Sequence, residues 1–303
     1  MNGRRLVALG VMALALAAPS TAAADDPPFV GWTALLPSLS LPYDPASPDD
    51  CIAGRSACVD KTIRQMTRRF NPLASSCDHN AMFSLTYLSV TQKYRSTILN
   101  NPSFFDDTSF VNYEDTIFAH YYFAAFDAWT SGQIEDVPPA WRITFDAASQ
   151  HEVSGIGDLL LGINAHVQRD LPFVLYSIGL TTPAGASRKP DHDRVDKILN
   201  RVIEPLIAEI ARRFDPTVDD AELPTSFDDA TLFQVLAAWR EKAWRNAEEL
   251  ANAPTKAARN LVIAQIENDA ASEAQTIVAG SAYPPLTNGS AQRDAYCAVH
   301  HGD

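Results

Sequence analysis

A histidine and an aspartate, His166 and Asp170, stand four residues apart in a strongly apolar stretch of the sequence. On an α-helix this spacing places both side chains on one face, one turn apart and close enough to hold the same metal ion. The neighbouring residues are mostly leucine, isoleucine, valine and alanine, so we expect the helix to be buried nearly all round. A charged group in such a place must be paired, hydrogen-bonded or bound to a metal. The pair is therefore the first candidate for a functional site.

The same helix is expected to span residues 151–171 and to carry further polar groups on that face. Asp158 lies about two turns before His166, and His151 lies at the start of the stretch. At about 1.5 Å per residue, His151 would be roughly 22 Å from His166, too far to share one metal ion through this helix. Glycines in the stretch would let a neighbouring helix or a ligand come close. These glycines are Gly155 and Gly162.

Two more histidines, His79 and His120, fall on the inward faces of other expected helices, and His120 shares its face with Asp127. Facing helices of a bundle can combine such residues into one metal site. The predicted ligands are His166, Asp170, His120 and His79. Asp158 and Asp127 are the predicted catalytic groups, because either could orient or deprotonate a water bound to the metal. Zinc suits this set of ligands best, with manganese or iron as alternatives.

The same residues fit a second interpretation, in which the protein is not an enzyme. Inward histidines and aspartates can form a hydrogen-bonded network that fixes the register of helices in a secreted protein that binds an apolar ligand or the cell envelope. A di-iron bundle has less support, because the chain lacks the Glu-x-x-His pairs that such bundles use. A serine hydrolase has little support either, since no G-x-S-x-G motif is present.

The elements that must position these residues are helices. Apolar residues recur at helical spacing through several long stretches, and neither an alternating strand pattern nor a repeat is found. We predict an all-α fold, a single bundle-like domain of about eight helices between residues 55 and 280. Pro172 is expected to kink or end the helix that carries Asp170. The expected helical segments are 56–70, 78–99, 109–131, 140–149, 151–171, 173–180, 193–214, 226–251 and 254–279.

Both ends of the chain are expected to lie outside this bundle. Residues 1–24 are typical of an export signal, with Arg4 and Arg5 before an apolar run and three alanines at its end. The apolar run is too short for a comfortable membrane span, so we predict a secreted or cell-envelope protein without a permanent membrane anchor. Residues 25–54 are rich in proline and serine and predict an extended leader, and residues 281–303 predict a coil tail.

The chain contains four cysteines, an even number in a protein expected to be exported. Disulfides are the usual state in that compartment, and four cysteines allow three pairings. We favour a local bond between Cys51 and Cys58 and a clamp between Cys77 and Cys297 that holds the tail to the body. Buried free thiols are the alternative.

The formal net charge of −13 argues against nucleic acid as the main partner and against anionic membranes. Aromatic residues near the histidines could shape an apolar pocket, so we expect a small-molecule or lipid-like substrate. No oligomeric state is predicted.

Four segments carry a resemblance to a known family. They are DHNAMFSLTYLSVT, FAHYYFAAFDAW, PPAWRITF and GINAHVQRDLPF. Together they resemble a family of actinobacterial helical proteins of unknown function, over roughly residues 55–250, and this resemblance implies no activity.

A shorter resemblance concerns the helix of His166 and Asp170, which is similar to the H-x3-D helix of zinc-dependent phospholipases C and single-strand nucleases. Those are secreted all-α enzymes that hold three zinc ions with histidine and aspartate. They have further histidines soon after the aspartate, whereas this chain continues with Leu171, Pro172 and Phe173. The resemblance therefore implies at most one or two metals, and with them an exported metal-dependent hydrolase of an ester or phosphoester.

Overall fold

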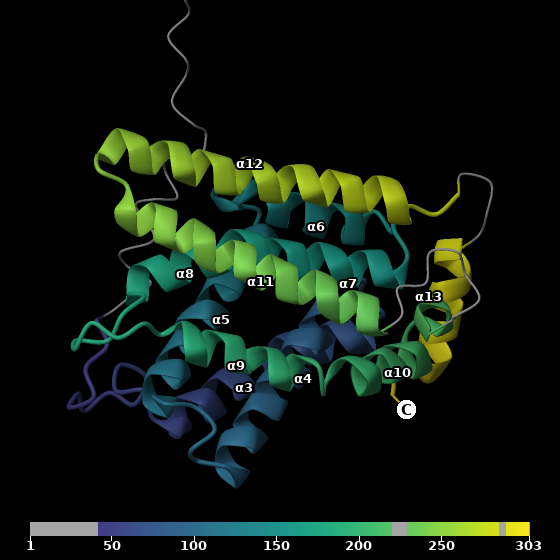
Figure 1. The fold of residues 1–303 in the computed structure, drawn as a ribbon. Coiled ribbons are helices and arrows are strands. Elements are labelled where there is room, and N and C mark those ends of the chain that lie inside the picture. Colours follow the sequence, from purple (N-terminus) through teal and green to yellow (C-terminus); the bar gives the residue numbers. More distant parts are fainter. Residues whose placement is uncertain (1–41, 220–228, 285–288, 303) are drawn as a thin grey trace, which may run out of the picture.

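The computed structural model describes residues 42–219, 229–284 and 289–302. These residues form an all-α fold without a strand, as predicted (Figure 1). The predicted signal, 1–24, and the leader up to residue 41 lie outside the described residues. The helices are α3 (Ser56–Ser75), α4 (Ala81–Asn100), α5 (Thr108–Thr130), α6 (Pro139–Ser149), α7 (Gly155–Asn164), α8 (Leu171–Ile178), α9 (Lys189–Leu199), α10 (Ile203–Arg213), α11 (Asp229–Asn252), α12 (Lys256–Ser281) and α13 (Gly289–His300).

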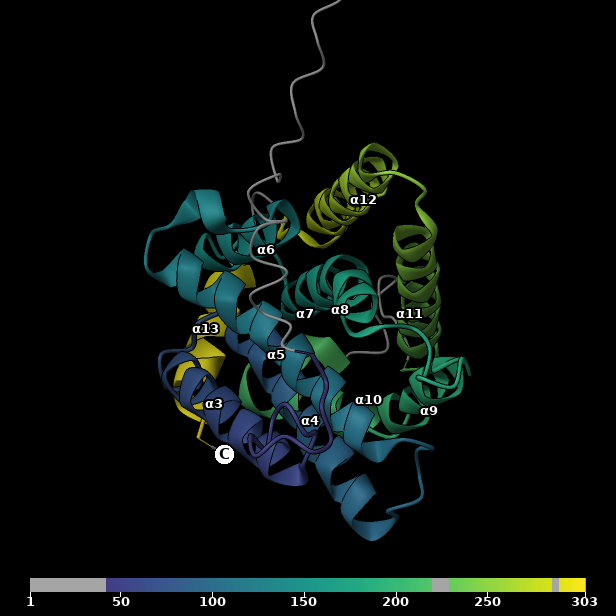
Figure 2. The same ribbon diagram turned by 90° about the vertical axis from the view of Figure 1, so that its left-hand side faces the viewer.

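A central helical segment organises the fold. It consists of α7, a π-helical turn η2 (Ala165–Asp170) and α8. Figure 2 shows α7 and α8 in the middle of the molecule, encircled by the other helices. They contact α4, α5, α6, α11 and α12, and nearly every side chain up to Leu175 is buried. The prediction of a helix buried all round is confirmed, and the core of the protein lies around this segment.

The π-helical turn is where the central segment accommodates its proline. Pro172 has no N–H group to donate to the preceding turn, so a regular α-helix cannot pass through it unchanged. The chain widens into η2 just before the proline and then continues as α8, so the segment neither stops nor restarts. Turns of this kind inside α-helices are frequent at functional sites.

His151 does not lie on this helix, so the prediction of a helix from residue 151 is wrong. Its backbone has a φ of 52°, in the left-handed region that ends α6. The helix begins at Gly155, because the Ser154 side chain accepts a hydrogen bond from the backbone N–H of Gly157 and so caps it. His151 is therefore free to lie away from the face that carries Asp158.

The helices differ from the predicted ones most clearly at three places. The first helix continues through Pro72 to Ser75, and the segment expected as 193–214 is two helices, α9 and α10, with a break at Asn200–Val202. The predicted coil tail is wrong, because residues 289–300 form α13. Only Arg293 and Cys297 of α13 are buried, so its sequence carries too few apolar residues for a clear helical period.

The two disulfides are those that were predicted. Cys51 pairs with Cys58, and Cys77 pairs with Cys297. The second bond joins the segment before α4 to α13, which lies beside α10 at one end of the molecule (Figure 1). Such bonds fit an extracellular protein. None of the helices in the described ranges is long and apolar enough to cross a membrane.

Candidate functional site

A cavity of about 120 Å³ lies against η2, between α4, α5, α9 and α11. We call it the His166 pocket. Aliphatic and aromatic side chains form most of its wall, among them Tyr87, Phe118, Ile163 and Leu236. Such a surface favours an apolar ligand, with specificity left to the few polar groups that reach the cavity.

The imidazole of His166 lines this pocket and is held by a carboxylate and by an aromatic ring. Its Nδ1 atom lies 3.1 Å from Oδ2 of Asp170, and the ring of Phe118 stacks on it at a centroid distance of 3.5 Å. Its Nε2 atom is buried and has no hydrogen-bond partner among the described residues. Burial lowers the pKa of His166, and the adjacent Asp170 carboxylate opposes this shift only in part. His166 is thus a neutral base whose Nδ1–H faces Asp170 and whose lone pair is on Nε2.

Asp170 is fully buried, and three groups donate to it. Nε1 of Trp141 donates to Oδ2 at 2.9 Å, and Nη1 of Arg169 donates to Oδ1 at 2.9 Å. With the imidazole of His166, these donors occupy both carboxylate oxygens. Arg169 also pairs with Glu267 of α12 at 2.7 Å. The arrangement orients His166, as the aspartate of a catalytic triad does, and leaves Asp170 little capacity to bind a metal as well.

Two neighbouring carboxyl groups of α5, Glu114 and Asp115, also line the His166 pocket. Burial raises the pKa of Glu114 to about 7, against the opposing effect of the Arg240 and Arg188 guanidinium groups. Burial also raises the pKa of Asp115 to about 7, and the nearby Glu114 adds to this rise. Around neutral pH these groups are therefore partly protonated, and a neutral carboxyl in an apolar site can donate a hydrogen bond.

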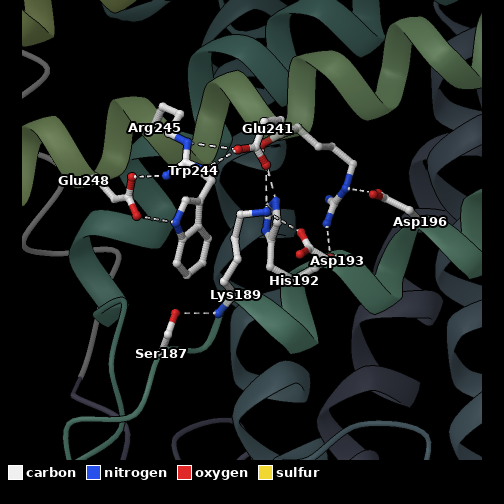
Figure 3. A network of polar contacts seen from close by, with 10 residues as sticks. Ser187, Lys189, His192, Asp193, Asp196, Glu241, Trp244, Arg245 and Glu248 are labelled. Carbon is white, nitrogen blue, oxygen red and sulfur yellow. Dashed lines mark hydrogen bonds and ion pairs between the residues drawn. The ribbon is translucent and has the colours of Figure 1, made fainter.

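Arg240 reaches the pocket wall from α11 and is fixed there by α9. Its Nε atom donates to Asp196, and its Nη2 atom donates to the backbone oxygen of His192, both at 2.6 Å. Figure 3 shows this contact zone, where Lys189 also pairs with Glu241. The network keeps the positive charge of Arg240 near the pocket carboxyls.

A second group of polar side chains, His79, His151 and Asp294, lies near the start of α4. We call it the His79 cluster. Nε2 of His79 lies 3.0 Å from Oδ1 of Asp294, and Nδ1 of His151 lies 2.8 Å from Oδ2. Burial would raise the pKa of Asp294, but its hydrogen bonds to the two histidines lower it below the usual value. Asp294 is therefore an ionised carboxylate.

Asp158 and Arg293 lie behind the His79 cluster. Nδ1 of His79 is 3.0 Å from Oδ2 of Asp158, and Nη1 of Arg293 is 3.6 Å from the same oxygen. Burial raises the pKa of Asp158, while His79 and Arg293 oppose this rise. The side chains of Asp158 and Arg293 are each 2% exposed, so this part of the cluster is closed to solvent.

The six residues predicted for the site are not brought together. His166 and Asp170 meet at the pocket, and His79 and Asp158 meet in the cluster. His120 lines a different cavity beside Lys61, and burial lowers its pKa. Asp127 is at the surface, bound to Arg69. Within the described ranges, the only three histidine, cysteine or acidic side chains whose ligand atoms converge are His79, His151 and Asp294.

The sequence reasoning gave no site role to four residues, because it placed His151 on the wrong helix and did not single out Asp294, Glu114 or Asp115. A signal for one of them was present. Because Cys77 and Cys297 were expected to pair, residues close to each cysteine had to be neighbours, which places Asp294 near His79. Nothing comparable marks Glu114 and Asp115, which look like ordinary acidic residues of a helix. The close approach expected at glycines is confirmed at Gly162, where Phe83 occupies the space of an absent side chain.

The fold and the pocket define an all-α protein with a buried histidine–aspartate pair beside an apolar cavity. The chain belongs to a family of unknown function, DUF5995, which it matches over residues 59–280. The expected resemblance to an uncharacterised family is thus confirmed. No curated protein and no solved structure shows a match. The matched range includes the histidines of both sites, whereas Asp294 lies beyond it.

Proposed function

We propose that this protein is an exported hydrolase that cleaves an ester with a short apolar acyl group in the His166 pocket, with His166 as the general base. The observation that carries the proposal is the unpartnered Nε2 atom of His166 at the wall of an apolar cavity, with Nδ1 held by a buried aspartate. A purely structural histidine would be expected to have both ring nitrogens satisfied.

The proposed ester hydrolysis depends on which side chains of the pocket can accept or donate a proton. Nε2 of His166 takes a proton from a water molecule, whose oxygen then attacks the ester carbonyl. Asp170 stabilises the imidazolium that forms, since it already receives the Nδ1–H group. A neutral carboxyl of Glu114 or Asp115 donates a hydrogen bond to the carbonyl oxygen as it becomes negative. The imidazolium finally gives its proton to the leaving alcohol.

The shape and lining of the pocket support the proposed substrate class. Its wall is mostly apolar, and a volume of about 120 Å³ suits a short acyl group better than a long lipid chain. The two disulfides support the exported part of the proposal, together with the signal predicted for residues 1–24.

The test uses the full-length mature protein without a polyhistidine tag and 4-nitrophenyl butyrate as the probe ester. We expect His166→Gln to lower kcat/KM by roughly 10²–10⁴-fold, the usual contribution of a general base. Asp127→Asn, at the surface, is the matched control and should retain the wild-type rate. Circular dichroism is used to check that both variants are folded.

Three outcomes would overturn the proposal. Wild-type protein that does not accelerate ester hydrolysis rules out the activity, and saturable binding of an apolar dye in the pocket would then favour the binding-protein interpretation. An unchanged rate in His166→Gln removes the general base. Complete loss of wild-type activity after treatment with a chelator, with recovery on adding zinc, would make a metal at His166 responsible and would return to the metal-dependent hydrolase expected from the sequence.

A further inference from the structure

We infer that His79, His151 and Asp294 bind one divalent transition-metal ion of the zinc class, and that this ion fastens α13 to the start of α4. The site is separate from the His166 pocket, and the inference does not depend on the proposed hydrolase activity.

The first support is the convergence of three suitable ligands. One ring nitrogen of each histidine and one carboxylate oxygen lie within 4.8 Å of one another. Zinc bonds to histidine nitrogen and carboxylate oxygen measure roughly 2.0–2.2 Å, so ligand atoms of one ion lie about 3–4 Å apart. Nε2 of His79 is 3.0 Å from Oδ1 of Asp294, and Nδ1 of His151 is 2.8 Å from Oδ2. An ion bound among the three groups would replace these two direct contacts.

The second support is the carboxylate behind His79. Oδ2 of Asp158 lies 3.0 Å from Nδ1 of His79, but the two atoms are not aligned for a hydrogen bond. A small turn of the imidazole would let Asp158 accept the Nδ1–H group and leave the lone pair on Nε2, the atom that faces Asp294. Histidines that bind metals commonly donate their other N–H group to a carboxylate in this way. In the metal-bound form Asp158 would thus orient the ligand without touching the ion.

The third support is the charge of the site. Asp294 and Asp158 bring two negative charges, and Arg293 brings one positive charge. The three nitrogen atoms of the Arg293 guanidinium group have no hydrogen-bond partner in the part of the chain that the structure describes. Arg293 therefore neutralises Asp158 only by proximity, and one negative charge remains beside two imidazoles. A cation at this place is electrostatically favoured.

The fourth support is the way in which the site is held and reached. Cys77 is two residues before His79, and Cys297 is three residues after Asp294. The disulfide between the two cysteines therefore keeps both ligands close together. His151 keeps a left-handed backbone that is unfavourable for residues other than glycine, and strain of this kind is found at functional sites. The side chain of His151 is 44% exposed, so an ion can enter from solvent and keep a water ligand.

The experiment measures zinc binding to the full-length oxidised protein, without a tag and after removal of metals with a chelator. Isothermal titration with zinc chloride and elemental analysis after desalting should both give one equivalent, and zinc should raise Tm. His151→Ala is the main variant, because this exposed side chain can be removed with little harm to the fold. We expect it to weaken zinc binding at least tenfold and to abolish the rise in Tm.

Two further variants make the result specific. Asp158→Asn should weaken zinc binding by about 10–100-fold, the usual effect of an outer carboxylate. His300→Ala is the matched control on α13, because the His300 ring bonds to the backbone oxygen of Tyr296, and it should bind zinc as the wild type does.

The inference fails if the wild-type protein takes up no stoichiometric zinc, or if His151→Ala binds zinc with the wild-type affinity. The first result would leave the three side chains as a hydrogen-bonded network. Zinc binding that is lost in His166→Gln but kept in His151→Ala would place the ion in the pocket instead. None of these results depends on ester hydrolysis, so failure here is distinguishable from failure of the proposed function.

Discussion

His166 and His79 each lie beside a buried aspartate at Nδ1, but the groups that face their Nε2 atoms differ. Each has its Nδ1 atom about 3 Å from a buried aspartate of the central segment, Asp170 in one case and Asp158 in the other. Beyond Nε2, however, His166 finds an apolar cavity without a partner, whereas His79 finds a second carboxylate. An aspartate on Nδ1 therefore fixes only the orientation of the imidazole. In the two proposals, the group that faces Nε2 decides whether the histidine is assigned the role of a base or of a metal ligand.

The two sites also differ in what holds them together. The His166 pocket depends on buried charges, since Arg169 joins Asp170 to Glu267 of α12 in the core. The His79 cluster is completed by α13, which a disulfide attaches to the body. One site should thus respond to changes in the core and the other to changes in the clamp. Phe83 lies between them, lining the His166 pocket and a small space beside His79.

Removing the clamp should produce the largest effect. In the chain-entropy description, a bond that closes a loop of 220 residues stabilises by about 5 kcal/mol, and one that closes 7 residues by about 2 kcal/mol. We expect Cys77→Ser with Cys297→Ser to lose the larger amount in urea unfolding, and to lose zinc binding, while folded protein keeps its esterase rate. The control is Cys51→Ser with Cys58→Ser. Equal losses in the two double variants would contradict the clamp.

Removing the buried guanidinium of Arg169 should have the opposite effect on the two sites, with a loss of esterase rate and retained zinc binding. Arg169→Met leaves Asp170 and Glu267 as two buried carboxylates without a counter-ion, which costs about 3–5 kcal/mol. The esterase rate should fall because Asp170 is no longer held in place, and zinc binding should be unchanged. The surface control Arg245→Met should unfold at nearly the wild-type urea concentration, because solvent screens the ion pairs of this exposed side chain. If Arg169→Met weakened zinc binding as much as it lowered the rate, the two sites would not be independent.

The sequence predicted the fold and the disulfides better than the sites, because the former depend on local patterns and the latter on packing. Helical periodicity and cysteine number depend on local patterns, and they led to the all-α fold and both disulfides. The His166–Asp170 pair was also local, because four residues of helix bring the two side chains together. The carboxyls of Glu114 and Asp115 meet that pair only through packing of α5 against η2, which no local pattern records.

The misplaced histidine illustrates the same limit. His151 precedes a strong apolar helix, and its spacing from Asp158 agrees with one face of that helix. The Ser154 cap ends this regularity, since the helix begins only at Gly155. His151 lies before this helix and meets His79 and Asp294 instead. The three residues come from three distant segments of the chain. A cluster of that kind can be predicted from sequence only where a covalent link, such as the Cys77–Cys297 bond, is already known.

The pocket carboxyls predict a pH dependence of stability. The pKa values of Glu114 and Asp115, about 7 in the folded protein, exceed their usual values near 4, so the folded state binds more protons between about pH 4 and 7. The free energy of unfolding should therefore fall as pH rises through this window. We expect Tm to decline from pH 5 to pH 8, and Asp115→Asn to reduce the decline by a few degrees.

The matched control for that experiment is Glu249→Gln, an exposed position on α11, which should keep the wild-type slope. The measurement is made without zinc, because zinc bound at the His79 cluster would add its own pH dependence to Tm. A slope that is identical in wild-type protein and in Asp115→Asn would show that this carboxyl is ionised in the pocket at pH 5, and would remove it as a hydrogen-bond donor.

Asp127 should give the smallest effect, although its residue type and spacing made it a predicted catalytic group. Both of its oxygens accept from Arg69, and its side chain is 58% exposed. An ion pair in contact with water contributes at most about 1 kcal/mol, since solvent screens it in the folded state. We expect Asp127→Asn to lower the free energy of unfolding by less than that and to leave both the esterase rate and zinc binding at the wild-type level. A tenfold loss of either would mean that α5 contributes its exposed face to a site, and that the division of chemistry between the two buried aspartates, Asp158 and Asp170, is incomplete.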